Sequence, residues 1–154
     1  TERELGDACD VLGCTFSIHE HPVRNFPEHR QSILDVITYY KKEYSPGLVI
    51  CPSLSDVHQD HRTVAEEAQR CFWRTSSVIS YELPWNVSAF RANYYVRLSL
   101  KNTEAKAEAA GKYKSQIAKG CDYMNTTKEL ASVRGANIEF GFAEAFEVIR
   151  IIDI

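Results

Sequence analysis

Residues 48–62 read LVICPSLSDVHQDHR, and this stretch decides how the rest of the chain is interpreted. The apolar run at 48–51 predicts a short buried strand. The apolar spacing from Val64 to Phe72 predicts a helix that begins near His61. A strand that leads through a polar loop into a helix is typical of ligand sites in α/β proteins, because loops at strand ends meet helix N-termini there.

Two histidines and two aspartates fall within this loop, namely Asp56, His58, Asp60 and His61. The His-x-x-His spacing can present both rings to one small volume, and the intervening aspartate can hold a ring in one tautomer. Polar loops also carry histidines that only face solvent. The spacing alone therefore leaves catalysis, metal binding and plain solvation open.

Composition indicates an ordinary globular protein. The 154 residues are 44% hydrophobic and 25% charged, which predicts a single domain over residues 1–154. The net charge of −3 argues against a nucleic-acid partner. No apolar run reaches the roughly 18 residues of a membrane span, and the first residues lack the features of a signal peptide. We therefore expect a cytoplasmic protein whose five cysteines are mostly reduced core thiols.

Helices and strands are expected to alternate through the first half of the chain. The predicted elements are a helix over 5–12, a strand over 14–18, a helix over 28–44, a strand over 48–51, a helix over 61–72 and a strand over 78–81. This order implies a parallel sheet covered on both faces. Later elements are a strand over 94–98, a helix over 105–117 capped by Asn102 or Thr103, a helix over 123–134 and a strand over 146–152.

The segment from Asp56 to His61 resembles the second signature, His-x-Asp-His, of the LmbE-like or PIG-L family of metal-dependent de-N-acetylases. Further features of that family are matched in the same order along nearly the whole chain. They are Arg3-Glu4-Leu5, Ala8, Leu12-Gly13, Tyr81-Glu82, Lys114-Ser115-Gln116, Arg134-Gly135 and Ala143-Glu144-Ala145-Phe146. The resemblance implies a Rossmann-like three-layer α/β sandwich with a mostly parallel sheet.

The first signature of that family, His-Pro-Asp-Asp, is not found in this sequence. Its nearest counterpart, residues 21–24, reads HPVR and lacks both carboxylates. By resemblance, the domain is expected to be N-terminally incomplete and to lack its first strand. Because that strand would lie inside the sheet, its loss would expose strand edges, which another chain or a second copy could cover. A homo-oligomer that completes the sheet is therefore one expectation.

By resemblance, His61 would be a ligand of zinc or another divalent metal. His58 would face the substrate carbonyl, where it would stabilise the oxyanion or protonate the leaving amine. Asp60 would orient His58, although an aspartate here could equally be the N-cap of the helix. The general base of the family belongs to the missing signature, and Glu20 or Asp56 would be the available substitutes.

Substrate contacts are expected in the loops that follow strands. Arg24 could bind a phosphate or carboxylate through its planar guanidinium, or form a surface ion pair. Glu82 and Asn86 could bind sugar hydroxyls, and Trp85 could stack on a sugar or lie in the core. His19 and His21 could bind a metal, or they could be ordinary exposed or core histidines. Arg134 could contact the substrate, or it could be the cation that complements a helix C-terminus.

Taken with the resemblance, these residues indicate a zinc-dependent hydrolase that removes an acetyl group from an N-acetylated sugar or sugar conjugate of the N-acetylglucosamine type. The alternative is a non-catalytic α/β carbohydrate-binding or assembly module derived from the same family. The presence of His58 and His61 favours the enzyme, and the missing first signature favours the module.

Overall fold

The computed structural model describes residues 1–153, whose contacts divide into two compact units. The first unit contains residues 1–19 and 95–144, and the second contains residues 20–94 and 145–153. The stretch from Leu48 to Arg62 belongs to the second unit. Among residues 1–153, no helix has the length and apolar character needed to cross a membrane.

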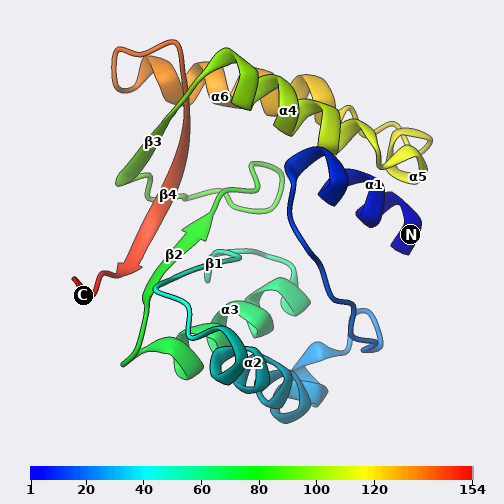
Figure 1. Cartoon of the computed structure of the whole chain (residues 1–154), viewed down its shortest axis with the longest axis vertical. Coiled ribbons are helices and arrows are strands. Elements are labelled where there is room, and N and C mark those ends of the chain that lie inside the picture. The colour runs from blue at the N-terminus through cyan, green and yellow to red at the C-terminus, as the bar shows by residue number, and fades with distance from the viewer. Residues whose placement is uncertain (154) are drawn as a thin grey trace. The chain divides into compact units, whose positions relative to one another are not determined.

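The second unit contains most of the elements expected from the first half of the sequence. These are the short helix η1 (Phe26–His29), α2 (Arg30–Tyr44), β1 (Leu48–Cys51), α3 (Gln59–Phe72) and β2 (Ser77–Tyr81). Ser45 ends α2 in the left-handed conformation, with φ of 44°. The helices α2 and α3 pack against each other, and α3 also contacts β1 and β2 (Figure 1). The strand–loop–helix arrangement predicted for residues 48–72 is therefore present.

The sheet is mixed, so the mostly parallel sheet expected from the sequence is not confirmed. β1 and β2 are parallel, with Leu48 opposite Ser77 and Cys51 opposite Ser80. β4 (Phe142–Arg150), which begins in the first unit and ends in the second, pairs with β2 in the antiparallel direction. The strand order is β1-β2-β4-β3, where β3 is Tyr94–Leu98. An apolar run predicts a strand but not its direction, which depends on where the chain enters the sheet.

The core of the second unit lies between α3 and the sheet. Its buried residues are Cys51, Ala65, Ala68, Phe72 and Val78. An ion pair between Arg30 and Glu67 joins α2 to α3. The guanidinium of Arg30 lies 2.5 Å from the carboxylate of Glu67, whose side chain is 0% exposed. Because a buried carboxylate is costly without a partner, we expect this pair to contribute to the packing of α2 on α3.

The first unit is mainly helical, with α1 (Glu2–Leu12), α4 (Leu100–Gly111), α5 (Lys114–Ile117) and α6 (Tyr123–Ala136). α4 packs against both α1 and α6 (Figure 1). Glu4 joins α1 to α5 because its carboxylate accepts hydrogen bonds from the backbone N–H and the hydroxyl of Ser115, at 2.7 and 2.8 Å. Gly135 is required for close packing, since a Cβ there would lie 2.6 Å from the carbonyl oxygen of Phe140.

Several predicted elements of the first unit differ from the structure. The strand predicted over residues 14–18 is wrong, because this segment pairs with no strand among the described residues. The helix predicted over 105–117 is two helices, since Tyr113 leaves the helical region with ψ of 66°. Ser99, not Asn102 or Thr103, is the N-cap of α4. The last strand begins four residues earlier than predicted and ends at Arg150.

Candidate functional site

The candidate site lies in the second unit, where the loop after β1 enters α3. His58 is the N-cap of α3, and its Nδ1 accepts a hydrogen bond from the backbone N–H of Asp60 at 3.2 Å. An imidazole nitrogen that accepts a hydrogen bond carries no proton, so the ring proton of His58 lies on Nε2. The loop therefore presents His58 Nε2 as a hydrogen-bond donor.

His61 has the opposite proton arrangement. Its Nδ1 lies 2.8 Å from Oδ2 of Asp56, which is 1% exposed. Asp56 also accepts the backbone N–H of His58 at 2.7 Å and Asn86 Nδ2 at 3.4 Å, so its carboxylate acts as an acceptor throughout. His61 therefore donates from Nδ1, and in the neutral ring Nε2 is the nitrogen that can accept a proton or bind a metal ion.

The two rings lie against each other. Their centroids are 4.6 Å apart and their planes differ by 22°. This follows from their places at the helix start, since His58 is the N-cap and His61 is at N3, and the side chains at these two positions lie beside each other. One nitrogen of each ring is held by the chain, and the two remaining nitrogens are a donor and an acceptor. Such a pair suits chemistry that moves a proton or stabilises a negative oxygen.

The Asp60 side chain neither orients His58 nor caps the helix, which are the two roles considered for it. It is not the N-cap, because His58 occupies that position. Its carboxylate accepts the backbone N–H groups of Arg24 at 2.6 Å and Phe26 at 3.3 Å. The backbone N–H of Asp60, and not its side chain, holds His58. Asp60 thus fixes the loop before α2 to the start of α3.

Arg24 is held at this site by its backbone. Its φ of 67° is left-handed, and its carbonyl oxygen accepts a hydrogen bond from the Gln59 side chain. The side chain of Arg24 is exposed, and its guanidinium makes no ion pair within residues 1–153. The surface ion pair considered for Arg24 is not formed within the described residues.

The loop after β2 contributes to the same site. The Asn86 side chain contacts Asp56 and His61, each at 3.4 Å. The backbone carbonyl oxygen of Asn86 accepts the backbone N–H of Val57 at 3.1 Å. Glu82 follows β2 directly. Trp85 is 53% exposed, so the core position considered for it is wrong.

The buried Cys51 and the half-buried Tyr81 adjoin the site at the ends of β1 and β2. Burial raises the pKa of the Cys51 thiol to about 11. Burial, with smaller contributions from Cys51 and Asp56, raises the pKa of Tyr81 to about 12. Both groups are therefore neutral near pH 7. The buried carboxylate of Asp56 is the group that His61 contacts.

The described residues fit one metal ligand but not a complete metal site. His61 Nε2 is oriented as second-shell carboxylates orient metal-binding histidines. Within residues 1–153, however, no three His, Cys, Asp or Glu side chains are arranged to hold a metal ion. The ring of His21 stacks on His29, with centroids 6.1 Å apart, and contacts Phe26 edge-on. The metal-ligand role considered for His21 gains nothing from this arrangement.

The importance of Asp56 was missed by the sequence reasoning, which considered it only as a substitute base. A signal was present, because an aspartate two residues before an N-cap histidine can accept the backbone N–H of that histidine. The contact with His61 five residues later depends on the turn at residues 53–56, in which Asp56 N–H donates to the Ser53 carbonyl at 3.1 Å.

Comparisons with known proteins support the fold. No protein-family model and no curated protein matches the chain. The chain is similar to the conserved protein TT1542 from Thermus thermophilus, with 19% identity, a TM-score of 0.76, and coverage of 99% of this chain and 74% of that one. It is also similar to GalB, the 4-carboxy-2-hydroxymuconate hydratase from Pseudomonas putida, with 14% identity, a TM-score of 0.71, and coverage of 99% and 73%.

Three other similar structures are deacetylases. The N,N'-diacetylchitobiose deacetylase from Pyrococcus horikoshii matches with 18% identity, a TM-score of 0.65, and coverage of 96% of this chain and 62% of that one. The teicoplanin deacetylase Orf2 and the A40926 pseudoaglycone deacetylase Dbv21 match with TM-scores of 0.65 and 0.67. At these identities the similarity establishes a shared α/β fold, and the presence of a hydratase shows that this fold serves more than one reaction.

Proposed function

We propose that this chain carries the catalytic histidines of a zinc-dependent hydrolase that removes the acetyl group from an N-acetylated sugar or sugar conjugate. The observation that carries the proposal is the stacked pair of His58 and His61, whose free nitrogens are a donor and an acceptor. The deacetylases among the similar structures support it, as does the resemblance of residues 56–61 to the LmbE-like signature. The cytoplasmic location expected from the sequence stays a prediction.

In this proposal His58 acts directly on the substrate. Its Nε2–H donates a hydrogen bond to the acetamide carbonyl oxygen, which becomes negatively charged when water adds to the carbonyl carbon. The N-terminus of α3 lies at the same place, and its positive dipole end favours that charge. When the tetrahedral intermediate collapses, acetate forms and the amine leaves with a proton that comes from the attacking water, while the Nε2–H of His58 stays hydrogen-bonded to the oxygen.

We propose that His61 Nε2 is one ligand of zinc or another divalent metal. Because residues 1–153 do not complete a ligand set, the remaining ligands would come from another segment or another chain. Asp56 and Asn86 act as positioning residues for His61 through the contacts described above.

The other residues of the site are assigned to positioning and substrate contact. Asp60 positions the Arg24 backbone, and the exposed guanidinium of Arg24 would bind an anionic group of the substrate. Glu82 would contact sugar hydroxyls. The Nδ2 of Asn86 is used within the protein, so only its side-chain oxygen would be offered to a sugar.

We also propose that a second copy of the chain covers the outer edge of β1. This strand lies at one end of the strand order, and its Leu48 and Ile50 are 50% and 51% exposed. An edge strand with apolar side chains favours pairing with another chain. Static light scattering would test this: a dimer that Ile50→Lys converts to a monomer is expected, and a wild-type monomer at about 100 μM would contradict it.

The catalytic proposal is tested by acetate release from N-acetylglucosamine conjugates in the presence of zinc. The decisive variant is His58→Asn, because asparagine is a good N-cap but lacks the Nε2 donor. We expect acetate release to fall by about 10²- to 10³-fold while the melting temperature stays near that of the wild type. Full activity in His58→Asn would contradict the role of His58.

Zinc content by elemental analysis tests His61 independently of activity. In a preparation that contains the segment or chain supplying the remaining ligands, stoichiometric zinc in the wild type that is lost in His61→Ala is expected if His61 is a ligand. Equal zinc in both proteins would contradict that assignment. No acetate release by the zinc-bound wild type would contradict the enzyme and favour the non-catalytic module.

A further inference from the structure

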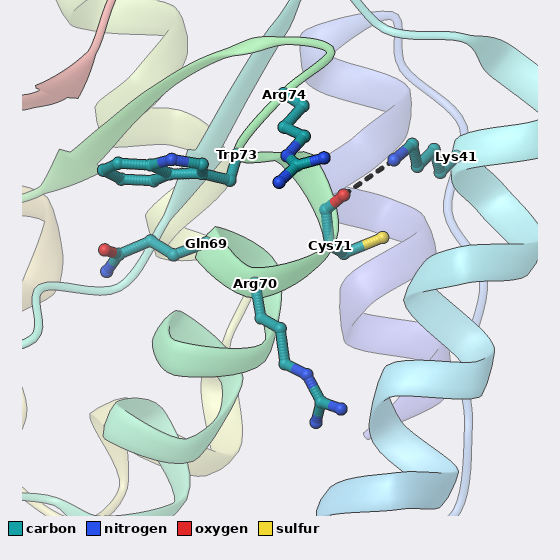
Figure 2. A pocket seen from close by; sticks show the side chains of 6 residues that line it. All are labelled: Lys41, Gln69, Arg70, Cys71, Trp73 and Arg74. Carbon is teal, nitrogen blue, oxygen red and sulfur yellow. Dashed lines mark hydrogen bonds between the residues drawn. The ribbon is translucent and has the colours of Figure 1, made fainter.

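A hollow lies at the other end of α3, within the second unit. It encloses about 480 Å³ and is lined by Lys41, Gln69, Arg70, Cys71, Trp73 and Arg74 (Figure 2). Small-molecule sites in proteins generally enclose roughly 300–1,000 Å³. The hollow is therefore large enough for a compact ligand, and none of its features is explained by the site at His58 and His61.

The charged side chains that line the hollow are all cationic. Figure 2 shows the ammonium group of Lys41 and the guanidinium of Arg74 pointing toward each other, while Arg70 points away from both. The Lys41 ammonium donates one hydrogen bond to the Cys71 carbonyl at 2.7 Å. The Arg74 guanidinium makes no hydrogen bond or ion pair with any residue from 1 to 153. Two facing cations repel each other, and an anion between them would remove that cost.

The C-terminal dipole of α3 does not by itself account for these charges. A helix C-terminus favours a nearby cation, and Lys41 already meets this need through the Cys71 carbonyl. Arg70 lies 3.4 Å from the carboxylate of Glu67. Arg74 is left over, in a chain whose net charge is −3. Its position is explained by an external anion better than by the helix.

A further feature of the hollow suits a ligand that is part anion and part ring. The indole of Trp73 remains 46% exposed, although the guanidinium of Arg150 lies 4.9 Å from its ring centroid. An indole with an exposed surface can stack on a planar group.

We propose that this hollow binds a phosphorylated small molecule. The phosphoryl group lies between Lys41 and Arg74, where the guanidinium fork can donate two parallel hydrogen bonds. The rest of the ligand lies against Trp73. A nucleoside monophosphate and a sugar phosphate share the phosphoryl chemistry, and they differ in whether a planar ring can stack on the indole.

The test is a titration followed by tryptophan fluorescence in a Trp85→Phe background, since the chain has only two tryptophans. The probes are inorganic phosphate, glucose 6-phosphate and adenosine monophosphate, at about 150 mM NaCl to suppress weak surface binding. We expect saturable changes with all three and the tightest binding for adenosine monophosphate. A preference for glucose 6-phosphate would keep the phosphoryl site and assign the ligand to the sugar phosphates.

Matched variants separate this site from general attraction of anions. Arg74→Gln is expected to weaken phosphate binding by about tenfold, whereas Arg70→Gln removes the same charge from a side chain that points away and should change it less than about twofold. Equal weakening by both variants would overturn the proposal, because it would show only a response to net charge. So would the absence of saturable binding below about 10 mM, measured both by fluorescence and by calorimetry.

Discussion

The two ends of α3 use their polar groups in different ways. At the N-terminal end, Asp56 and the backbone of Asp60 fix one nitrogen on each of two histidines. At the C-terminal end, the Arg74 guanidinium has no such partner within residues 1–153. The first end is organised by the chain itself, and the second has hydrogen-bond donors in excess. We infer that histidines with fixed protons are suited to catalysis, whereas hydrogen-bond donors without a partner in the chain are suited to binding an anion.

The largest expected effect is on the free energy of unfolding, and it distinguishes cations that stabilise the fold from cations that do not. Arg30→Met removes the main partner of the fully buried Glu67, so we expect the free energy of unfolding to fall by about 3 kcal/mol. Arg70→Met removes a cation that lies 3.4 Å from the same carboxylate but is mostly exposed, and we expect a fall below about 1 kcal/mol. Urea denaturation of both variants measures the difference. Equal losses would show that the C-terminal cations are structural after all.

A somewhat smaller effect is expected at the N-terminal end. Asp56→Asn keeps the shape of the side chain but removes the charge that accepts from His61 and from the His58 backbone. Because a hydrogen bond to a charged group contributes about 1.5–3 kcal/mol, a loss of roughly 2 kcal/mol in the free energy of unfolding is expected by urea denaturation. An unchanged value would mean that the carboxylate does not hold the rings.

The free energy of unfolding should also fall at alkaline pH, because of a thiol near the N-terminal end of α3. The pKa of Cys51 is about 11 in the folded chain and 9.0 when unperturbed, so folding favours the neutral thiol. Its contribution to stability is complete below pH 9 and is lost as the pH rises toward 11, with a slope of at most about 1.4 kcal/mol per pH unit.

Cys51→Ala should therefore flatten the decline in unfolding free energy between pH 9 and 11. Tyr81, whose pKa is about 12, adds a decline of the same sign that begins above its unperturbed value of 10.0. An equally steep decline in Cys51→Ala would show that another group titrates.

The smallest effect is expected at Arg74. Because its side chain is exposed and makes no hydrogen bond or ion pair within residues 1–153, Arg74→Gln should change the free energy of unfolding by less than about 0.5 kcal/mol. Thermal melting measures this directly. A large loss would mean that Arg74 supports the fold and that its position needs no external anion.

The sequence predicted elements where local pattern and packing agree. The helical spacing of α2 and α3 matches their buried faces, and these helices and β1 were predicted nearly to their ends. The expectation that β1 is buried is wrong, because Leu48 and Ile50 are half exposed at the edge of the sheet. Residues 14–18 alternate like a strand, but a strand also requires a partner, which local alternation cannot supply. The antiparallel direction of β4 was not predicted either, since it depends on distant parts of the chain.

The site was predicted in composition but not in its hydrogen bonds. The rings of His58 and His61 lie together, as the His-x-x-His spacing predicted, because the N-cap and N3 side chains lie beside each other at a helix start. The exchange of roles between Asp56 and Asp60 could not be predicted, because it depends on helix α3 beginning at Gln59 and not near His61. That shift made His58 the N-cap and directed the Asp60 carboxylate to Arg24 and Phe26.

The central claim is that the chain fixes His58 and His61 in opposite tautomers. Long-range ¹H–¹⁵N correlation spectra of the imidazoles at pH 7.5 to 8 would test it most directly, with His58→Asn and His61→Asn used for assignment. We predict that His58 carries its proton on Nε2 and His61 carries its proton on Nδ1. If both rings show the same tautomer, or rapid exchange between the two, the account of the site is contradicted.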